Sequence, residues 1–154
     1  MFERLLPRRA DNAYGGHRAG LWLFALLTLG KGAMSLNSVF NGYRVATAAD
    51  GIPLDTYTPA GARAVVSMFA AWGLAQLALC LVCVLVLARY RALVPFMLAL
   101  LLLEHLCRRL LFLLIPVERT GAPPGPYVNV VLAVLMVAAL ALSLRGRGGG
   151  RVGG

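Results

Sequence analysis

The sequence predicts an all-α fold: a four-helix transmembrane bundle with both termini in the cytoplasm. Of its 154 residues, 60% are hydrophobic and 14% charged, and the mean hydropathy is +0.77. Soluble domains carry about 45–50% apolar and about 25% charged residues, so both values indicate a membrane environment. Four apolar runs and a one-sided distribution of arginine support the same fold. The length fits one compact domain.

A helix that crosses the ~30 Å hydrocarbon core needs ~20 mostly apolar residues. The run 64–88 is the clearest, because it contains no charged side chain. The run 127–144 is equally apolar and follows the breaker sequence Ala122-Pro-Pro-Gly-Pro126. Both are predicted to span the membrane.

The apolar run of the first predicted helix, 21–40, is interrupted by Gly30-Lys31-Gly32. Its apolar core has the length of a signal-peptide h-region, but no Ala-x-Ala-like cleavage site follows closely. We therefore expect it to be retained as a membrane helix. The segment 1–20 before it is predicted to be cytoplasmic.

The third predicted helix, 92–115, contains eleven leucines and also several polar side chains. Each mid-membrane charge costs ~2.5–3.5 kcal/mol and each leucine returns ~0.3–0.6 kcal/mol, so this helix is marginal without partners. The polar side chains are Glu104, His105, Arg108 and Arg109.

Arginine placement predicts the orientation, because cytoplasmic loops are enriched in arginine and lysine. Nine arginines flank one side of the predicted helices and three the other, where acidic residues accompany them. The tail 145–154 is rich in glycine and arginine and is predicted to be disordered. The first side holds Arg4, Arg8, Arg9, Arg18, Arg89, Arg91, Arg145, Arg147 and Arg151; the second holds Arg44, Arg63 and Arg119 with Asp50, Asp55 and Glu118.

The net charge of +9 does not indicate nucleic acid, because the arginines lie at the ends of apolar runs. Membrane lipid is the expected partner. No metal-ligand cluster, phosphate loop or nucleophile–base pair is present, so we predict no catalytic residue and no metal site.

Polar side chains on three predicted helices lie at similar depth. Counted from the cytoplasmic side at 1.5 Å per residue, Lys31 lies ~15 Å deep, Gln76 ~17 Å and Glu104 ~18 Å. Buried charges in a membrane are rarely left unpaired, and they are candidate functional residues. We hypothesise an ion pair between Lys31 and Glu104, with Gln76 and Arg108 around it, as a binding site. Fixing the helix register is the alternative role of such a pair.

The spacing of the remaining polar residues predicts two further pairs on the third helix. Glu104 and Arg108 are four residues apart and share a face, and so do His105 and Arg109. Arg109 also lies close enough to Pro116 to reach the outer surface, where both arginines would act as interface anchors. If Lys31, Arg108 and Arg109 all face inward, the site favours an anion, an anionic lipid head group or a polar quinone-like head.

Small residues and cysteines on the helices are expected to pack rather than react. Ser67, Ala71 and Ala75 form a small-xxx-small ridge, and Thr28 with Gly32 forms another. Cys80 and Cys83 are spaced like a redox motif but lie within an apolar helix, without a helix N-terminus or a nearby cation.

The outer loop 41–60 is longer than a helix hairpin requires and contains the turn sequence Asp50-Gly-Ile-Pro53. Solvated carboxylates are the expected state of Asp50 and Asp55, ahead of a cation site. Loops of this length are often functional, and a lid over the outer end of the bundle is one such role.

The stretch from Arg18 to Lys31 resembles the opening of DoxX-like membrane proteins, in which an arginine precedes helix one and a glycine and a lysine lie within it. The resemblance implies a four-helix bundle of the bacterial inner membrane. It also implies, loosely, association with membrane oxidoreductases or with quinone. The residues that it would carry over are Arg18, Gly30 and Lys31.

The leading functional prediction is a non-catalytic accessory or binding subunit that holds a partner or an amphiphile at Lys31, Gln76, Glu104 and Arg108, with His105 and Arg109 in secondary positions. The alternatives are a quinone-linked oxidoreductase component and a small transporter. No cofactor is predicted from the residues. A second copy of the chain or another membrane protein is the expected protein partner.

Overall fold

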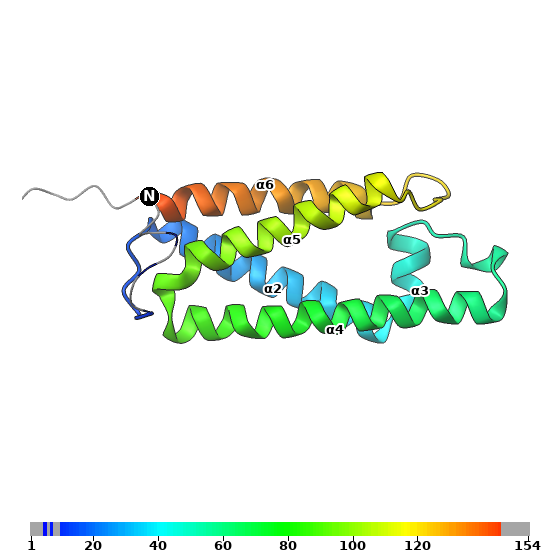
Figure 1. Ribbon diagram of the computed structural model, residues 1–154, viewed down its shortest axis with the longest axis horizontal. Helices are drawn as coiled ribbons and strands as arrows, with labels where there is room; N and C mark the ends of the chain where they lie inside the picture. The colour runs from blue at the N-terminus through cyan, green and yellow to red at the C-terminus, as the bar shows by residue number, and fades with distance from the viewer. Residues whose placement is uncertain (1–4, 6, 8–9, 146–154) are drawn as a thin grey trace, which may run out of the picture.

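The computed structural model describes residues 5, 7 and 10–145, and these form an all-helical structure without strands. Four long helices lie along one axis (Figure 1). Short helical turns occupy the connections: α3 (Gly42–Arg44), a π-helical turn (Val45–Ala49), and 3₁₀ turns at Leu54–Thr56 and Arg91–Leu93. The long helices are α2 (Arg18–Phe40), α4 (Pro59–Arg89), α5 (Val94–Leu114) and α6 (Gly125–Leu144).

Three of these helices, α2, α4 and α6, are long and apolar enough to cross a membrane. The prediction of an all-α fold is therefore confirmed, and three of the four predicted spans are helices that could cross a membrane. Helix α5 has 21 residues but carries Glu104, Arg108 and Arg109, and its crossing stays a prediction. The predicted disordered tail lies outside the described residues, apart from Arg145.

The helix boundaries lie within a few residues of the predicted ones, except at the start of α4. Capping explains two earlier starts. The His17 Nδ1 accepts a hydrogen bond from the Ala19 amide at 3.2 Å, and the Thr58 hydroxyl accepts one from the Gly61 amide at 3.1 Å. Helix α2 is continuous through Gly30, Lys31 and Gly32, so these residues interrupt the apolar run but not the helix.

The described ends of α2 and α6 meet at the same end of the bundle. The His17 amide donates a hydrogen bond to the Leu142 carbonyl at 3.1 Å. Figure 1 shows the α4–α5 turn at this end and the two longer connections at the other. The structure therefore places both described chain ends at one end of the bundle, and the side of the membrane that they face stays a prediction.

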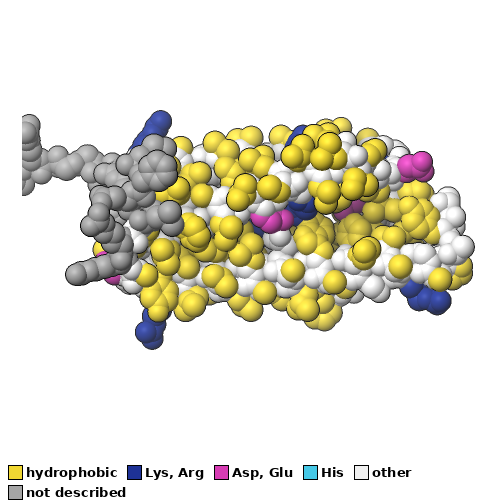
Figure 2. All heavy atoms as spheres, viewed as in Figure 1, with side chains coloured by type: hydrophobic (Ala, Val, Ile, Leu, Met, Phe, Trp, Pro, Cys, Tyr) yellow, Lys and Arg dark blue, Asp and Glu magenta, His cyan; other side chains and the backbone are white. Residues whose placement is uncertain are grey.

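The interior is layered along the bundle axis. An apolar core fills the half near the chain ends, and a small apolar cluster under the 41–58 loop closes the opposite end. The outward-facing helix surfaces are also apolar: Trp22 is 75% exposed and Phe40 78%. Figure 2 shows acidic and basic side chains at mid-length of an otherwise hydrophobic face. This polar layer separates the two apolar clusters.

Close helix packing depends on a glycine that the small-residue ridges did not identify. A Cβ atom added to Gly73 of α4 would lie 2.9 Å from the Ser35 carbonyl oxygen and from the Ser38 Cβ of α2. The predicted ridges do not make this contact, although Thr28 of the second ridge is buried. A Cβ on Gly32 would meet no atom within 4 Å, and the ridge of α4 faces outward, since its residues are all exposed: Ser67, Ala71 and Ala75.

The α2–α4 and α5–α6 connections are joined by hydrogen bonds. The Gly51 carbonyl accepts hydrogen bonds from the Thr120 amide at 2.8 Å and from its hydroxyl at 3.2 Å. Gly51 has φ +73°, a left-handed conformation that favours glycine. This turn places Asp50 beside Gly125, at the N-terminus of α6.

Candidate intramembrane binding site

The polar layer is built on one face of α2. Lys31 is only 6% exposed, and Thr28, Ser35 and Ser38 on the same face are also buried, as their helical spacing predicts. Each hydroxyl donates to a carbonyl of its own helix, for example Ser35 to Lys31 at 2.7 Å. The opposite charge nearest to Lys31 is therefore sought on another helix, because α2 carries no acidic side chain.

The predicted interhelical ion pair is present. The Lys31 Nζ lies 3.6 Å from the Glu104 Oε2, and the Arg108 Nε lies 3.8 Å from the Glu104 Oε1. Charge-assisted hydrogen bonds are usually about 2.7–2.9 Å, so both contacts are long. The Glu104 Oε2 is buried and accepts no hydrogen bond in the described structure. The cluster is thus paired in charge but not saturated in hydrogen bonding.

Gln76 of α4 adds a second unsaturated group. Its side chain is 9% exposed, and its Oε1 is buried without a hydrogen-bond donor in the described structure. An unsatisfied buried acceptor costs about 1–3 kcal/mol, so such groups usually mark a place where water or a ligand binds.

Besides Glu104, the guanidinium of Arg108 contacts two further side chains. Its Cζ lies 4.6 Å from the centroid of the Trp72 ring, and its Nη2 lies 3.1 Å from the His105 Nδ1. A guanidinium only donates hydrogen bonds, so the His105 Nδ1 is the acceptor and His105 is neutral with its proton on Nε2. The predicted pairing of His105 with Arg109 is therefore wrong; the partner is Arg108, three residues away.

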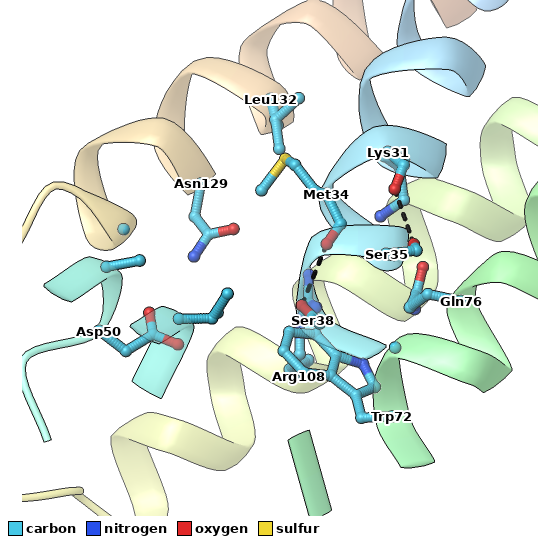
Figure 3. A pocket seen from close by; sticks show the side chains of 14 residues that line it. Lys31, Met34, Ser35, Ser38, Asp50, Trp72, Gln76, Arg108, Asn129 and Leu132 are labelled. Carbon is cyan, nitrogen blue, oxygen red and sulfur yellow. Dashed lines mark hydrogen bonds between the residues drawn. The ribbon is translucent and has the colours of Figure 1, made fainter. Parts of the chain in front are cut away.

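Two adjacent cavities adjoin this cluster. The inner one, about 90 Å³, lies among α2, α4, α5, α6 and the 41–58 loop, and the outer one, about 130 Å³, lies between α5 and α6. In Figure 3, Asp50 and Asn129 lie across the inner cavity from Lys31, Ser35 and Gln76. Both cavities share four lining residues, which are Asp50, Trp72, Arg108 and Asn129.

Of the six predicted site residues, Lys31, Gln76 and Arg108 line the inner cavity. Glu104 stands behind them, as the partner of Lys31 and Arg108. The secondary residues line the outer cavity instead: His105 is buried there, whereas Arg109 is exposed.

Asp50 is the residue that the sequence did not assign to this site. The carboxylate was expected in a solvated loop, but Asp50 is half-buried and lines both cavities. Burial raises the pKa of the Asp50 carboxyl, while the charges of Arg119 and Arg108 oppose that shift. Asn129 was missed as well, although a lone amide in the apolar sequence of α6 is a signal of the same kind as Gln76.

Two of the three cysteines are buried in the bundle, as expected of packing residues. Cys80 and Cys83 are free and buried, whereas Cys107 is exposed. The expectation that no cation lies near the pair is wrong, because Lys31 is close enough to Cys80 for a coulombic interaction. Cys83 belongs to the apolar core cluster, which does not include Cys80.

Comparison of the chain with protein-family models, with curated proteins and with solved structures finds no match. The DoxX-like resemblance stays a prediction. Function is therefore argued from the site itself.

Proposed function

We propose that this chain is a non-catalytic binding subunit of a membrane, which holds the polar end of an amphiphile in the inner cavity beside Lys31 and Gln76. The proposal includes a four-helix topology with both termini in the cytoplasm, and a bacterial inner membrane as its location. The DoxX-like resemblance supports the location, and the arginine distribution supports the orientation.

The supporting observation is unused hydrogen-bonding capacity around an existing cavity. Among the described residues, the Gln76 Oε1 has no hydrogen-bond donor, and the Lys31 Nζ has one carboxylate contact, which is long. Within a membrane such groups are more costly than in water, because no solvent is at hand to satisfy them. A polar ligand that donates to Gln76 and accepts from Lys31 would satisfy both groups.

The size of the cavity favours a small polar group. A liquid water occupies about 30 Å³, and a cavity of about 150 Å³ admits benzene. The inner cavity of about 90 Å³ therefore suits a few polar atoms better than an aromatic ring. This comparison disfavours the quinone alternative, since a quinone ring would have to extend into the outer cavity.

Native mass spectrometry of the full chain after mild solubilisation tests the proposal. The wild-type protein is expected to retain an amphiphile adduct, and Gln76→Leu to lose it. The same substitution removes an unsatisfied buried acceptor, so it is expected to leave the thermal stability equal or higher. Loss of the ligand without loss of stability separates binding from folding.

Asn37→Leu is the matched control, because Asn37 is an exposed amide on α2 that lines neither cavity. It is expected to retain the adduct. A wild-type protein that carries no adduct under conditions that preserve bound lipid, or equal retention by Gln76→Leu and Asn37→Leu, would refute the proposal.

A further inference from the structure

We propose that the polar end of the bound amphiphile carries an oxyanion, of the phosphate or carboxylate class. Arg108 lines both cavities and receives this oxyanion on the side of the outer cavity, while the neighbouring polar atoms of the ligand occupy the inner cavity beside Lys31 and Gln76. This inference rests on the proposed function, because it names the chemistry of the same ligand. It is carried by the arrangement of Arg108, by the charges around the outer cavity and by the apolar wall of that cavity.

The guanidinium of Arg108 is held in place and still has hydrogen-bond donors that could bind an oxyanion. One face of its guanidinium lies against Trp72, and its Nη2 is bound to His105. Its Nε points to Glu104 at 3.8 Å, and its Nη1 donates no hydrogen bond within the described part of the chain. A guanidinium fixed in this way keeps donors free in a planar fork, the geometry that binds phosphate or carboxylate in a bidentate manner.

The outer cavity has an excess of positive charge. Three arginines line it, Arg108, Arg109 and Arg119, against one carboxylate, Asp50, which leaves an excess of two charges. Neither Arg109 nor Arg119 forms an ion pair with a carboxylate of the described residues. The neutral state of His105 adds no charge. A ligand with one or two negative charges would balance this wall.

Apolar side chains next to these arginines suit an acyl chain. Phe112, Leu113 and Pro126 also line the outer cavity, and Leu113 is 72% exposed on the outer surface of the bundle. A head group held by Arg108 can therefore leave its tail along α5 in the lipid phase. Cationic and apolar walls side by side match an anionic amphiphile better than a free ion.

Trp72 is a reporter placed at the site. The sequence contains two tryptophans, so Trp22→Phe leaves Trp72 as the only one. The full chain with this substitution is placed in phosphatidylcholine nanodiscs and titrated with 1-acylglycerol 3-phosphate, while Trp72 fluorescence is recorded. The phosphate amphiphile is expected to give a saturable change. 1-Acylglycerol, with the same tail but no phosphate, is expected to bind at least about tenfold more weakly, because charged hydrogen bonds are lost.

Two substitutions of opposite expected effect separate recognition from folding. Arg119→Gln removes one cation from the rim and should weaken binding about tenfold. Asp50→Asn removes the only carboxylate of the cavity wall and should tighten binding severalfold, a gain that misfolding cannot produce. Arg63→Gln is the matched control, since Arg63 is an exposed arginine that lines neither cavity.

Inorganic phosphate in competition identifies the source of the oxyanion. Competition would show that the free ion suffices, and failure to compete would show that the acyl chain is required; both agree with an oxyanion site. Equal binding of the two amphiphiles, or equal affinities of Arg119→Gln and Arg63→Gln, would overturn the inference. If a neutral amphiphile still depends on Gln76 in the mass spectrometer, the proposed function survives that failure.

Discussion

Lys31 shows why a buried charge fixes several neighbours at once. Its charge lies in the polar layer of the bundle, and among the described residues only Glu104 lies within ion-pair distance of it. Glu104 in turn faces Arg108, so two cations share one carboxylate. Removing either end of the Lys31–Glu104 pair leaves a charge with poorer compensation than before.

A double-mutant cycle on Lys31 and Glu104 should therefore show strong coupling. Lys31→Met alone is expected to lose ~3–5 kcal/mol of unfolding free energy, because Glu104 is left with Arg108 as its only partner. The double variant Lys31→Met/Glu104→Leu should lose less than the sum of the two single losses, with a coupling energy of ~0.5–3 kcal/mol. Denaturant unfolding in mixed micelles, followed by circular dichroism, measures all four forms. Purely additive effects would mean that the pair contributes no interaction energy.

At the residue scale, the site residues that could be predicted from the sequence are those on the long helices. Depth counting brought Lys31, Gln76 and Glu104 to one level, because the rise per residue of a helix is fixed. It could not bring in Asp50, whose position depends on how the 41–58 loop folds back. It also paired His105 with the wrong arginine, since i,i+3 and i,i+4 neighbours are both within reach on a helix.

At the scale of the elements, the contact between α2 and α4 depends on rotation about each helix axis. Helix α4 is apolar on all sides, so its sequence pattern does not show which face is inside. The small-residue spacing of Ser67, Ala71 and Ala75 likewise does not reveal that these residues face outward. The extent of the helices was easier to predict, because caps and prolines mark their ends.

Gly73 and Gly30 provide a matched test of this contact. Gly73→Ala places a methyl group 2.9 Å from the backbone oxygen of Ser35, and separating two backbones is expected to cost ~1–3 kcal/mol. Gly30→Ala meets no atom within 4 Å and should stabilise α2 by ~0.5–1 kcal/mol through helix propensity. Thermal unfolding of the two variants in the same detergent gives the comparison. A stability loss from Gly30→Ala as large as that from Gly73→Ala would contradict the packing described here.

On the scale of the whole molecule, polar groups lie where α5 is only loosely packed against α2 and α4. Helix α2 packs mainly against α4 and α6, and α5 packs mainly against α6. Few close contacts join α2 to α5, so the Lys31–Glu104 pair bridges a loosely packed interface. The charges that make α5 marginal as a membrane helix are therefore the same charges that attach it to α2. Helix α5 and the binding site depend on one another.

This dependence leads to a prediction for the topology. If the pair carries α5 into the membrane, the two longer connections lie on the outer side and the chain ends inside. In a background without Cys80, Cys83 and Cys107, Thr56→Cys and Glu118→Cys should react with a membrane-impermeant maleimide on intact cells. Asn12→Cys should react only after permeabilisation. All three positions are exposed in the structure.

The Glu118 position distinguishes four crossings from three. With α5 across the membrane, Glu118 and Thr56 lie on the same side, because two crossings, α4 and α5, separate them. With α5 held on the inner surface, Glu118→Cys would be protected while Thr56→Cys still reacted. A second experiment combines Glu118→Cys with Lys31→Met. Removing the partner of Glu104 raises the free energy of burying α5 in the membrane, so the fraction of Glu118→Cys that reacts should fall. Unchanged labelling would mean that the apolar surface of α5 suffices for insertion without the ion pair.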